Sequence, residues 1–370
     1  MSPATESIVR KLVVLATVAG LGSALAFLLV ACGGGGTIAA RSRPASWEKL
    51  PAAPFKAKGL AGLTSAWTGK ELIVTAVQPG PDGTFINSKD VAAAYDPSTR
   101  SWRRLPAAPK MQNYCRQDAA WTGSQMVLWG CGQAALDPAK GAWRMLPKAP
   151  TGHGFLAWTG SELVGWGGGC CGDAWDGGSA YDPASNQWHT LARSPLAPAQ
   201  GPMGVWNGHE LIVVVSGYSP DDKPYPASFA RTAAYDPATD TWRRLAAPLA
   251  SELRYGGVAA WDGHELLVVG SKSARRQALL AFNPATDRWH RLAQPPRGLN
   301  PLGAFWTGKR LLVLGGDEAL RALVYDPKTD RWTALPRMPL LGSYETATWT
   351  GHELVVWSSA GGAVFTPASD

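Results

Sequence analysis

Few side chains in this sequence have a spacing that suggests catalysis. Five of the six histidines fall at repeated positions, three just after a glycine and two just after a tryptophan, so they do not converge on one centre. The histidines are His153, His189, His209, His264, His290 and His352. There is no Gly-x-Ser-x-Gly nucleophile motif, Walker phosphate-binding loop or His-Glu-x-x-His zinc motif. We therefore expect no cofactor, no metal site and no catalytic residue, and an enzyme is not favoured.

Better candidates for a ligand site are polar and aromatic residues that lie outside the repeated positions. Arginine, tyrosine, histidine and carboxylate side chains near the axis of a ring-shaped fold could bind a polar ligand such as a glycan. The alternative is that they only solvate the mouth of a channel. The ligand-binding candidates are Tyr114, Arg116, Asp118, His153, Arg254, Tyr255, Tyr344 and Glu345.

The first cysteine belongs to a targeting segment. Arg10-Lys11 precede the apolar stretch Leu12 to Ala31, and Leu29-Val30-Ala31-Cys32 is similar to a bacterial lipobox. We expect residues 1–31 to be a lipoprotein signal peptide, Cys32 to carry the lipid, and the glycine-rich residues 32–45 to be a flexible tether. An uncleaved signal anchor is the alternative. Either arrangement places the rest of the chain outside the cytoplasmic membrane.

The other four cysteines are candidates for disulfides, because an oxidising compartment favours bridges. If the hairpin after Trp121 has a three-residue loop, 122–124, Cys115 lies directly opposite Cys131. Cys170 and Cys171 would then form a vicinal bridge or stay reduced, and crossed pairings between the two sets are alternatives. Metal binding is disfavoured because no histidine has ligand spacing to these cysteines.

Two short sequence motifs alternate along the chain, and they predict its strands and turns. Trp67-Thr68-Gly69 precedes an apolar run, and Tyr95-Asp96-Pro97 is followed by Trp102, seven residues after the tyrosine. The first motif recurs at Trp121, Trp158, Trp206, Trp261, Trp306 and Trp349, and the second, with some drift, at Leu136, Tyr181, Tyr235, Phe282, Tyr325 and Phe365. Successive copies of the first motif lie 37 to 55 residues apart. This spacing is typical of propeller blades or another stacked array.

Each repeat is interpreted as four antiparallel strands. Trp-x-Gly forms the turn between the first and second strands, and Asp-Pro starts the turn between the third and fourth. The seventh repeat lacks its last strand, but residues 46–54 match residues 101–109 closely. The N-terminal strand should therefore complete the last blade and leave no open sheet edge. We predict an all-β fold over residues 46–370, a seven-bladed β-propeller closed by this strand.

With this spacing the sequence resembles the kelch family of β-propellers. The aromatic-x6-Trp spacing is that family's signature, and a glycine pair after the second strand, as in Gly315-Gly316 and Gly167-Gly168-Gly169, completes it. Quinone-dehydrogenase propellers are a rival resemblance, which the Trp-x-x-Leu-Pro tail disfavours. Galactose oxidase has a kelch-type propeller, but its copper ligands have no counterpart here. The kelch resemblance also leaves a sugar epimerase or mutarotase as the alternative function, with such polar groups as general acid and base.

The charge balance is mildly basic. Removing residues 1–31, which contain Arg10, Lys11 and Glu6, lowers the net charge from +7 to +6. A positive surface suits an anionic cell envelope. Nucleic-acid binding is not indicated, because the basic residues are scattered and the repeated tryptophans are structural. We predict a monomeric, lipid-anchored binding module that recognises an envelope glycan or a protein partner through the loops of one propeller face.

Overall fold

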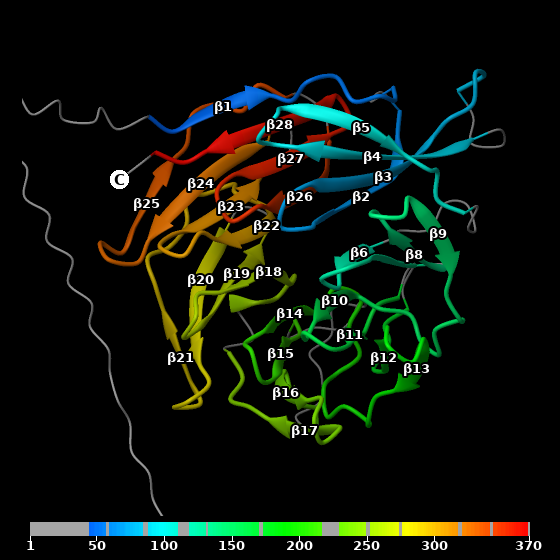
Figure 1. The fold of residues 1–370 in the computed structure, drawn as a ribbon. Coiled ribbons are helices and arrows are strands. Elements are labelled where there is room, and N and C mark those ends of the chain that lie inside the picture. The colour runs from blue at the N-terminus through cyan, green and yellow to red at the C-terminus, as the bar shows by residue number, and fades with distance from the viewer. Residues whose placement is uncertain are drawn as a thin grey trace, which may run out of the picture. The chain divides into compact units, whose positions relative to one another are not determined.

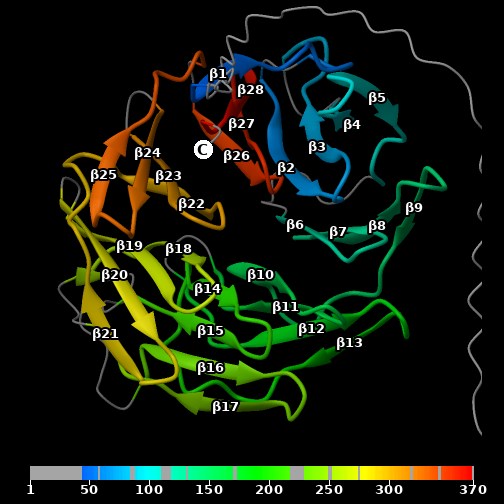
Figure 2. The same ribbon diagram turned by 60° about the vertical axis from the view of Figure 1, so that its left-hand side comes forward.

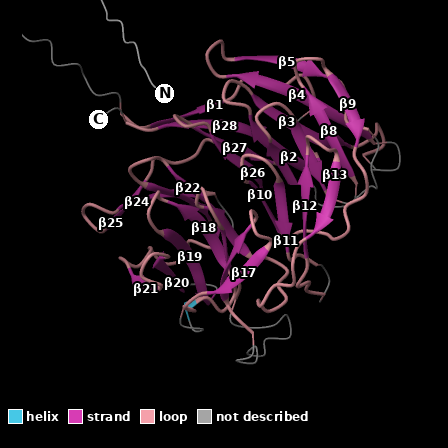
Figure 3. Ribbon diagram, turned by 60° about the horizontal axis from the view of Figure 1, so that its bottom comes forward, coloured by secondary structure: helices cyan, strands magenta, loops and turns pink. Residues whose placement is uncertain are grey.

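The structure is a computed structural model that describes residues 44–56, 59–83, 88–109, 118–130, 132–169, 173–216, 229–248, 252–273, 276–316, 320–340 and 343–368. These residues form seven antiparallel sheets of four strands each, joined by loops (Figure 3). The predicted signal peptide, residues 1–31, and the predicted lipidation site, Cys32, lie outside the described residues, as does nearly all of the predicted tether.

Each blade contains an inner, a second, a third and an outer strand (Figure 1). The inner strands are β2 (Ala61–Trp67), β6 (Asp118–Trp121), β10 (Phe155–Trp158), β14 (Met203–Trp206), β18 (Gly257–Trp261), β22 (Pro301–Trp306) and β26 (Tyr344–Trp349). The second strands are β3 (Leu72–Gln78), β7 (Met126–Trp129), β11 (Leu163–Trp166), β15 (Leu211–Val214), β19 (Leu266–Ser273), β23 (Leu311–Gly315) and β27 (Leu354–Ser358).

The third strands are β4 (Lys89–Asp96), β8 (Gln133–Asp137), β12 (Gly178–Asp182), β16 (Thr232–Asp236), β20 (Arg276–Asn283), β24 (Arg321–Asp326) and β28 (Gly361–Thr366). The outer strands are β5 (Ser101–Leu105), β9 (Ala142–Met145), β13 (Gln187–Thr190), β17 (Thr241–Arg244), β21 (Arg288–Arg291), β25 (Arg331–Ala334) and β1 (Ser46–Lys49). Blades 1 to 6 follow the chain from β2 to β25, and blade 7 combines β26, β27 and β28 with β1.

The ring closes as the sequence predicts. The inner strands contact one another in chain order, and β26 contacts β2 (Figure 2). Strand β1 pairs with β28, so that Trp47 lies opposite Phe365. The N-terminal strand therefore supplies the outer strand of blade 7, and the predicted seven-bladed propeller is confirmed.

The seven-residue spacing from aromatic to tryptophan has a simple structural cause. Tyr95 pairs directly with Trp102 across β4 and β5, and their ring centroids lie 5.0 Å apart. The same pairing joins Tyr235 to Trp242 at 5.1 Å. The outer-strand tryptophans of blades 1 to 6 also bond to the preceding blade, as when Trp102 Nε1 donates to the Pro51 carbonyl at 3.0 Å. The repeated tryptophan is thus an inter-blade contact, and apolar clusters fill all seven blade interfaces.

The Trp-x-Gly hairpins differ from the prediction in one respect. The glycine has a positive φ, for example 91° at Gly123, as a tight turn requires. However, Trp121 pairs with Met126, and Thr122 N donates to the Gln125 carbonyl. The loop is one residue longer than expected, because the Thr122 hydroxyl also caps the turn. The register used to place Cys115 opposite Cys131 is therefore wrong, and both cysteines lie outside the described residues.

Candidate functional site

The two ends of the propeller differ in their connections. Because the strands are antiparallel, the turns between inner and second strands and between third and outer strands emerge at one end, which we call the hairpin face. The connections between second and third strands, and those from blade to blade, emerge at the other end, which we call the loop face. All described candidate residues belong to the loop face, since they stand at the start of an inner strand or just before it.

Two of the predicted residues are in direct contact. His153 Nε2 lies 3.1 Å from Asp118 Oδ2, and this contact joins blade 3 to blade 2. The imidazole also packs against the indole of Trp129, with ring centroids 4.9 Å apart. The His153 side chain is only 5 % exposed, whereas that of Asp118 is 27 % exposed. The pair can hold a ligand only through the Asp118 carboxylate, because the histidine is packed beneath the surface.

Glycines make room for this histidine. A Cβ at Gly165 would lie 2.8 Å from the Trp129 ring and 2.9 Å from His153 Cβ. A larger residue at position 165 would therefore displace Trp129 and His153. A Cβ at Gly168 would lie 2.6 Å from the His153 carbonyl oxygen, and Gly168 has a φ of 107°. The glycine run after β11 is therefore needed for close backbone approach at the loop face.

A second group lies before the inner strand of blade 5. The Arg254 guanidinium stacks 5.5 Å from the ring centroid of Tyr255. Nearby in the chain, the carboxylate of Glu252 is buried and forms ion pairs with Lys272 at 2.7 Å and Arg291 at 3.0 Å. This group therefore has three basic side chains, Arg254, Lys272 and Arg291, and the carboxylate of Glu252.

The third group is Tyr344 and Glu345 at the start of β26. The pairing of β26 with β27 shifts by one residue between Tyr344 and Thr346, so Glu345 stands at a bulge. Burial raises the pKa of the Glu345 carboxyl above its ordinary value. A half-buried carboxyl at a bulge of an inner strand is a reasonable proton donor or hydrogen-bonding group for a ligand.

Exposed aromatic side chains mark the loop face of blades 3 to 5. Among the described residues, four large hydrophobic residues are exposed: Met145 at 54 %, Trp175 at 44 %, Phe229 at 36 % and Tyr255 at 59 %. Trp175 lies between β11 and β12, Phe229 between β15 and β16, and Tyr255 between β17 and β18. All three aromatic residues therefore lie on the loop face of successive blades. We call Trp175, Phe229 and Tyr255 the aromatic patch.

One connecting segment contacts the residues of the aromatic patch or their neighbours in the chain. This segment, residues 194–201, runs from blade 3 to blade 4. Trp175 and Ala199 form an isolated antiparallel bridge, in which Ala199 N donates to the Trp175 carbonyl at 3.0 Å. Ala230, the neighbour of Phe229, donates to the Pro195 carbonyl at 2.8 Å. A Cβ on Gly256, the neighbour of Tyr255, would lie 4.0 Å from the Gly201 carbonyl oxygen. Trp175 and Ala230 are thus hydrogen-bonded to this stretch of backbone, and Gly256 lies beside it.

The structure brings together some of the predicted site residues. Asp118 and His153 are in contact, Arg254 and Tyr255 stack, and Tyr344 and Glu345 are neighbours on a separate blade. Two candidate residues, Tyr114 and Arg116, and the disulfide candidates Cys115, Cys131, Cys170 and Cys171 lie outside the described residues. In the described part of the chain, no group of three metal-ligating side chains is placed to hold a metal ion, and no helix has the length and apolar character to cross a membrane.

Sequence reasoning missed Trp175 and Phe229. A signal was present, since both belong to the long connections between second and third strands, and Trp175 is outside the two repeated tryptophan positions. Three other tryptophans are also outside those positions, but Trp129, Trp166 and Trp357 are buried at the ends of second strands. Only the structure separates the exposed tryptophan from the buried ones.

Comparison with known proteins supports the fold. No protein-family model matches the sequence, and no curated protein matches it. A solved structure of YCF48 bound to D1 peptide is similar, with a TM-score of 0.58 and 12 % sequence identity. The similarity covers 89 % of this chain and 96 % of that chain. At this level of identity the likeness shows a shared propeller fold.

Proposed function

We propose that this chain is a lipid-anchored, extracytoplasmic kelch-like propeller that binds a protein partner through the aromatic patch on its loop face. The single observation that carries the proposal is the exposure of Trp175, Phe229 and Tyr255 on the loop face of successive blades, where each residue or its chain neighbour lies beside residues 194–201. Exposed aromatic residues that cluster on one surface are typical of protein-binding sites.

Two further observations support a polypeptide partner. The Arg254 guanidinium stacks on Tyr255 and thereby presents a cation beside an aromatic ring, a combination enriched in the energetically dominant residues of interfaces. The similar YCF48 structure was solved bound to D1 peptide, which supports a polypeptide as the partner proposed for this chain. An extended segment could lie across the patch and reach the Asp118 carboxylate of blade 2.

The membrane anchor in this proposal rests on the N-terminal sequence. Cys32 follows small and apolar residues in a segment similar to a lipobox, and basic residues precede that segment. A lipid at Cys32 would leave the glycine-rich residues 33–36 between the membrane and the first strand of the propeller. Partners would then be proteins of the same envelope surface.

Site-specific photo-crosslinking in cells tests the proposal. A photoreactive amino acid at position 255 or 175 should give the same discrete protein adduct, because both positions belong to the patch. The matched control is position 145, since Met145 is similarly exposed but lies on the outer strand β9. Trp175→Ala should remove the adduct formed from position 255 without changing the amount of protein.

Two results would contradict the proposal. Adducts that form equally well from position 145 would indicate docking on the outer rim of the blades. Absence of a protein adduct at positions 175 and 255, together with binding of envelope glycans that depends on Asp118 and Glu345, would favour the glycan-binding function instead.

A further inference from the structure

We propose that the hairpin face carries a second binding site, a pocket between blades 3 and 4 that takes an alkylammonium or guanidinium group. The pocket has a volume of about 530 Å³. It lies at the end of the propeller opposite the aromatic patch, so the inference is independent of the proposed function. Its walls are Thr159, Ser161, Glu162 and Asp182 of blade 3 and Trp206, Gly208, His209, Pro237 and Ala238 of blade 4.

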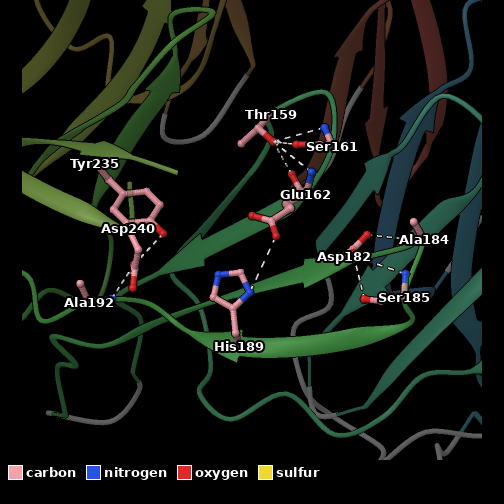
Figure 4. A network of polar contacts seen from close by, with 10 residues as sticks. All are labelled: Thr159, Ser161, Glu162, Asp182, Ala184, Ser185, His189, Ala192, Tyr235 and Asp240. Atoms are coloured by element: carbon pink, nitrogen blue, oxygen red, sulfur yellow. Dashed lines mark hydrogen bonds and ion pairs between the residues drawn. The ribbon is translucent and has the colours of Figure 1, made fainter. Parts of the chain in front are cut away.

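The pocket is acidic and contains no lysine or arginine among its lining residues. Glu162 lies beside the imidazole of His189, whose Nδ1 is 3.8 Å from Glu162 Oε1 (Figure 4). Asp182 accepts hydrogen bonds from the Ser185 hydroxyl at 2.7 Å and from Ala184 N at 2.8 Å. These bonds, that of the Ser185 hydroxyl above all, hold the pKa of Asp182 below its ordinary value. The pocket therefore keeps a carboxylate charge that no long basic side chain neutralises.

Other blades show which side chains lie beside the positions equivalent to Glu162 and Asp182. In blade 1 the equivalent carboxylates are Glu71 and Asp96, and the chain supplies its own cation at Lys70. The Lys70 ammonium contributes to lowering the pKa of both carboxyls, although the largest causes are Arg103 for Glu71 and Ser98 for Asp96. In blade 6, Arg310 occupies the position of Glu71, and its Nε lies 3.0 Å from Asp326 Oδ2. The hairpin face thus places a cation of this chain against the same aspartate position in both blades.

Blade 3 lacks that internal cation. The residue after the hairpin glycine is Ser161 there, whereas blades 1 and 6 have lysine and blades 4, 5 and 7 have histidine. Blade 2 also has a serine, Ser124, but its next residue is Gln125 rather than glutamate. In addition, Arg103 of blade 1 and Arg243 of blade 4 form two hydrogen bonds each to the hairpin glutamate, and His189 replaces them in blade 3. Blade 3 is therefore the only blade that combines a small residue after the hairpin glycine, Ser161, with acidic residues at both positions, Glu162 and Asp182.

The chemistry of the walls favours an organic cation over a metal ion. Calcium requires six or more oxygen ligands, and in the described part of the chain no group of three or more His, Cys, Asp or Glu side chains is placed to hold a metal ion. Trp206 contributes an aromatic wall, and aromatic rings attract ammonium and guanidinium groups more strongly as water is removed. An alkylammonium group would place its charge near the carboxylates, as Lys70 does in blade 1, and its methylene groups near Trp206, Pro237 and Ala238.

Saturation-transfer NMR on the full-length chain in a non-ionic detergent tests this inference, with n-butylammonium as the probe and n-butanol as its neutral counterpart. Wild type should transfer saturation to the butyl protons of the ammonium probe and much less to those of the alcohol. Ser161→Lys places in the pocket the lysine that blade 1 already has, and should weaken probe binding by about tenfold or more. Glu162→Gln should also weaken the binding of n-butylammonium. Nα-acetyl-lysine methylamide, run as a second probe, shows whether a protein lysine side chain is bound as well as a free amine.

The matched control is Ser124→Lys, which makes the same change in the hairpin of blade 2 and should leave binding unchanged. Equal binding by wild type and Ser161→Lys would overturn the inference, as would equal signals from n-butylammonium and n-butanol. The absence of any signal from wild type would overturn it too. Because the aromatic patch lies on the other face, Ser161→Lys should leave the crosslinks formed from position 255 intact, so failure of one proposal is distinguishable from failure of the other.

Discussion

Asp240 Oδ1 accepts a hydrogen bond from the backbone N–H of Ala192 at 2.8 Å and so joins blade 4 to blade 3 (Figure 4). The carbonyl of the same alanine accepts a hydrogen bond from Trp242 Nε1 at 3.0 Å. One residue that follows an outer strand is thus held at both of its backbone polar groups by the next blade. The Asp240 carboxylate also accepts a hydrogen bond from the Tyr235 hydroxyl at 2.9 Å.

This two-point contact recurs only where the chain offers a backbone N–H. Ala246 is held by Asp287 and Trp289, and Ala293 by Asp330 and Trp332. At three blade interfaces the held residue is proline; there the tryptophan bond remains, but the position of the aspartate is taken by another residue with positive φ. These prolines are Pro51, Pro106 and Pro147, and the corresponding positions are Arg100, Gly141 and Asn186. Proline has no N–H to donate, so an aspartate there would lack this partner.

The first prediction concerns Asp287, whose blade has Phe282 instead of tyrosine and so offers the aspartate no hydroxyl. Asp287→Gly should lower the free energy of unfolding by about 1 kcal/mol, because it removes the acceptor for Ala246 N–H. Glycine tolerates the positive φ, as Gly141 does in blade 2. Chemical denaturation of the full-length chain measures the effect. Ala246→Pro should cost less in the Asp287→Gly background than in wild type, and equal costs would contradict the contact.

A second prediction compares two repeated tryptophans. Trp102 Nε1 donates to the Pro51 carbonyl, whereas the buried Nε1 of Trp47 has no hydrogen-bond partner among the described residues. Trp102→Phe should therefore destabilise the fold by about 1 kcal/mol more than Trp47→Phe, since only the former breaks a hydrogen bond. Melting temperatures of the two variants provide the measurement. A larger loss for Trp47→Phe would show that the closing strand is held differently.

The third prediction uses the raised pKa of Glu345, which burial causes. A carboxyl whose pKa is higher in the folded than in the unfolded state binds more protons when folded, so stability falls as pH rises from the unfolded pKa through the folded one. Glu345→Gln removes this penalty. The variant should gain stability relative to wild type between about pH 3 and about pH 7. Melting curves at both pH values test this, and a constant difference would show that Glu345 is not desolvated.

The fourth prediction concerns the anchor. Cys32→Ser should prevent lipidation, so the protein should leave the membrane fraction or remain unprocessed. Fractionation and intact mass measure the two outcomes. If the membrane fraction and the mass are both unchanged, the apolar stretch before Cys32 is an uncleaved signal anchor. Binding through the loop face would then be unaffected, because that proposal depends only on the propeller.

The sequence by itself was sufficient for the architecture. Each repeat carries its own turn residues, such as Gly123, and every blade except blade 2 has its own cross-strand aromatic pair, such as Tyr235 with Trp242. These signals are local, so they repeat at recognisable intervals and identify every blade. The match between residues 46–54 and 101–109 also predicted that the N-terminal strand closes the ring, because a strand without a partner must find the open sheet edge.

Only the tertiary structure decided which residues meet between blades. Asp118 and His153 are 35 residues apart, and their contact depends on the close approach that Gly165 permits. The aromatic patch depends on irregular connections, which expose Trp175, Phe229 and Tyr255 on the loop face beside residues 194–201 without any repeat in the sequence. Connections of this kind take their course from packing against neighbouring blades rather than from local propensity. The repeats therefore encode the ring, and the irregular segments between them create the surfaces on which binding is proposed.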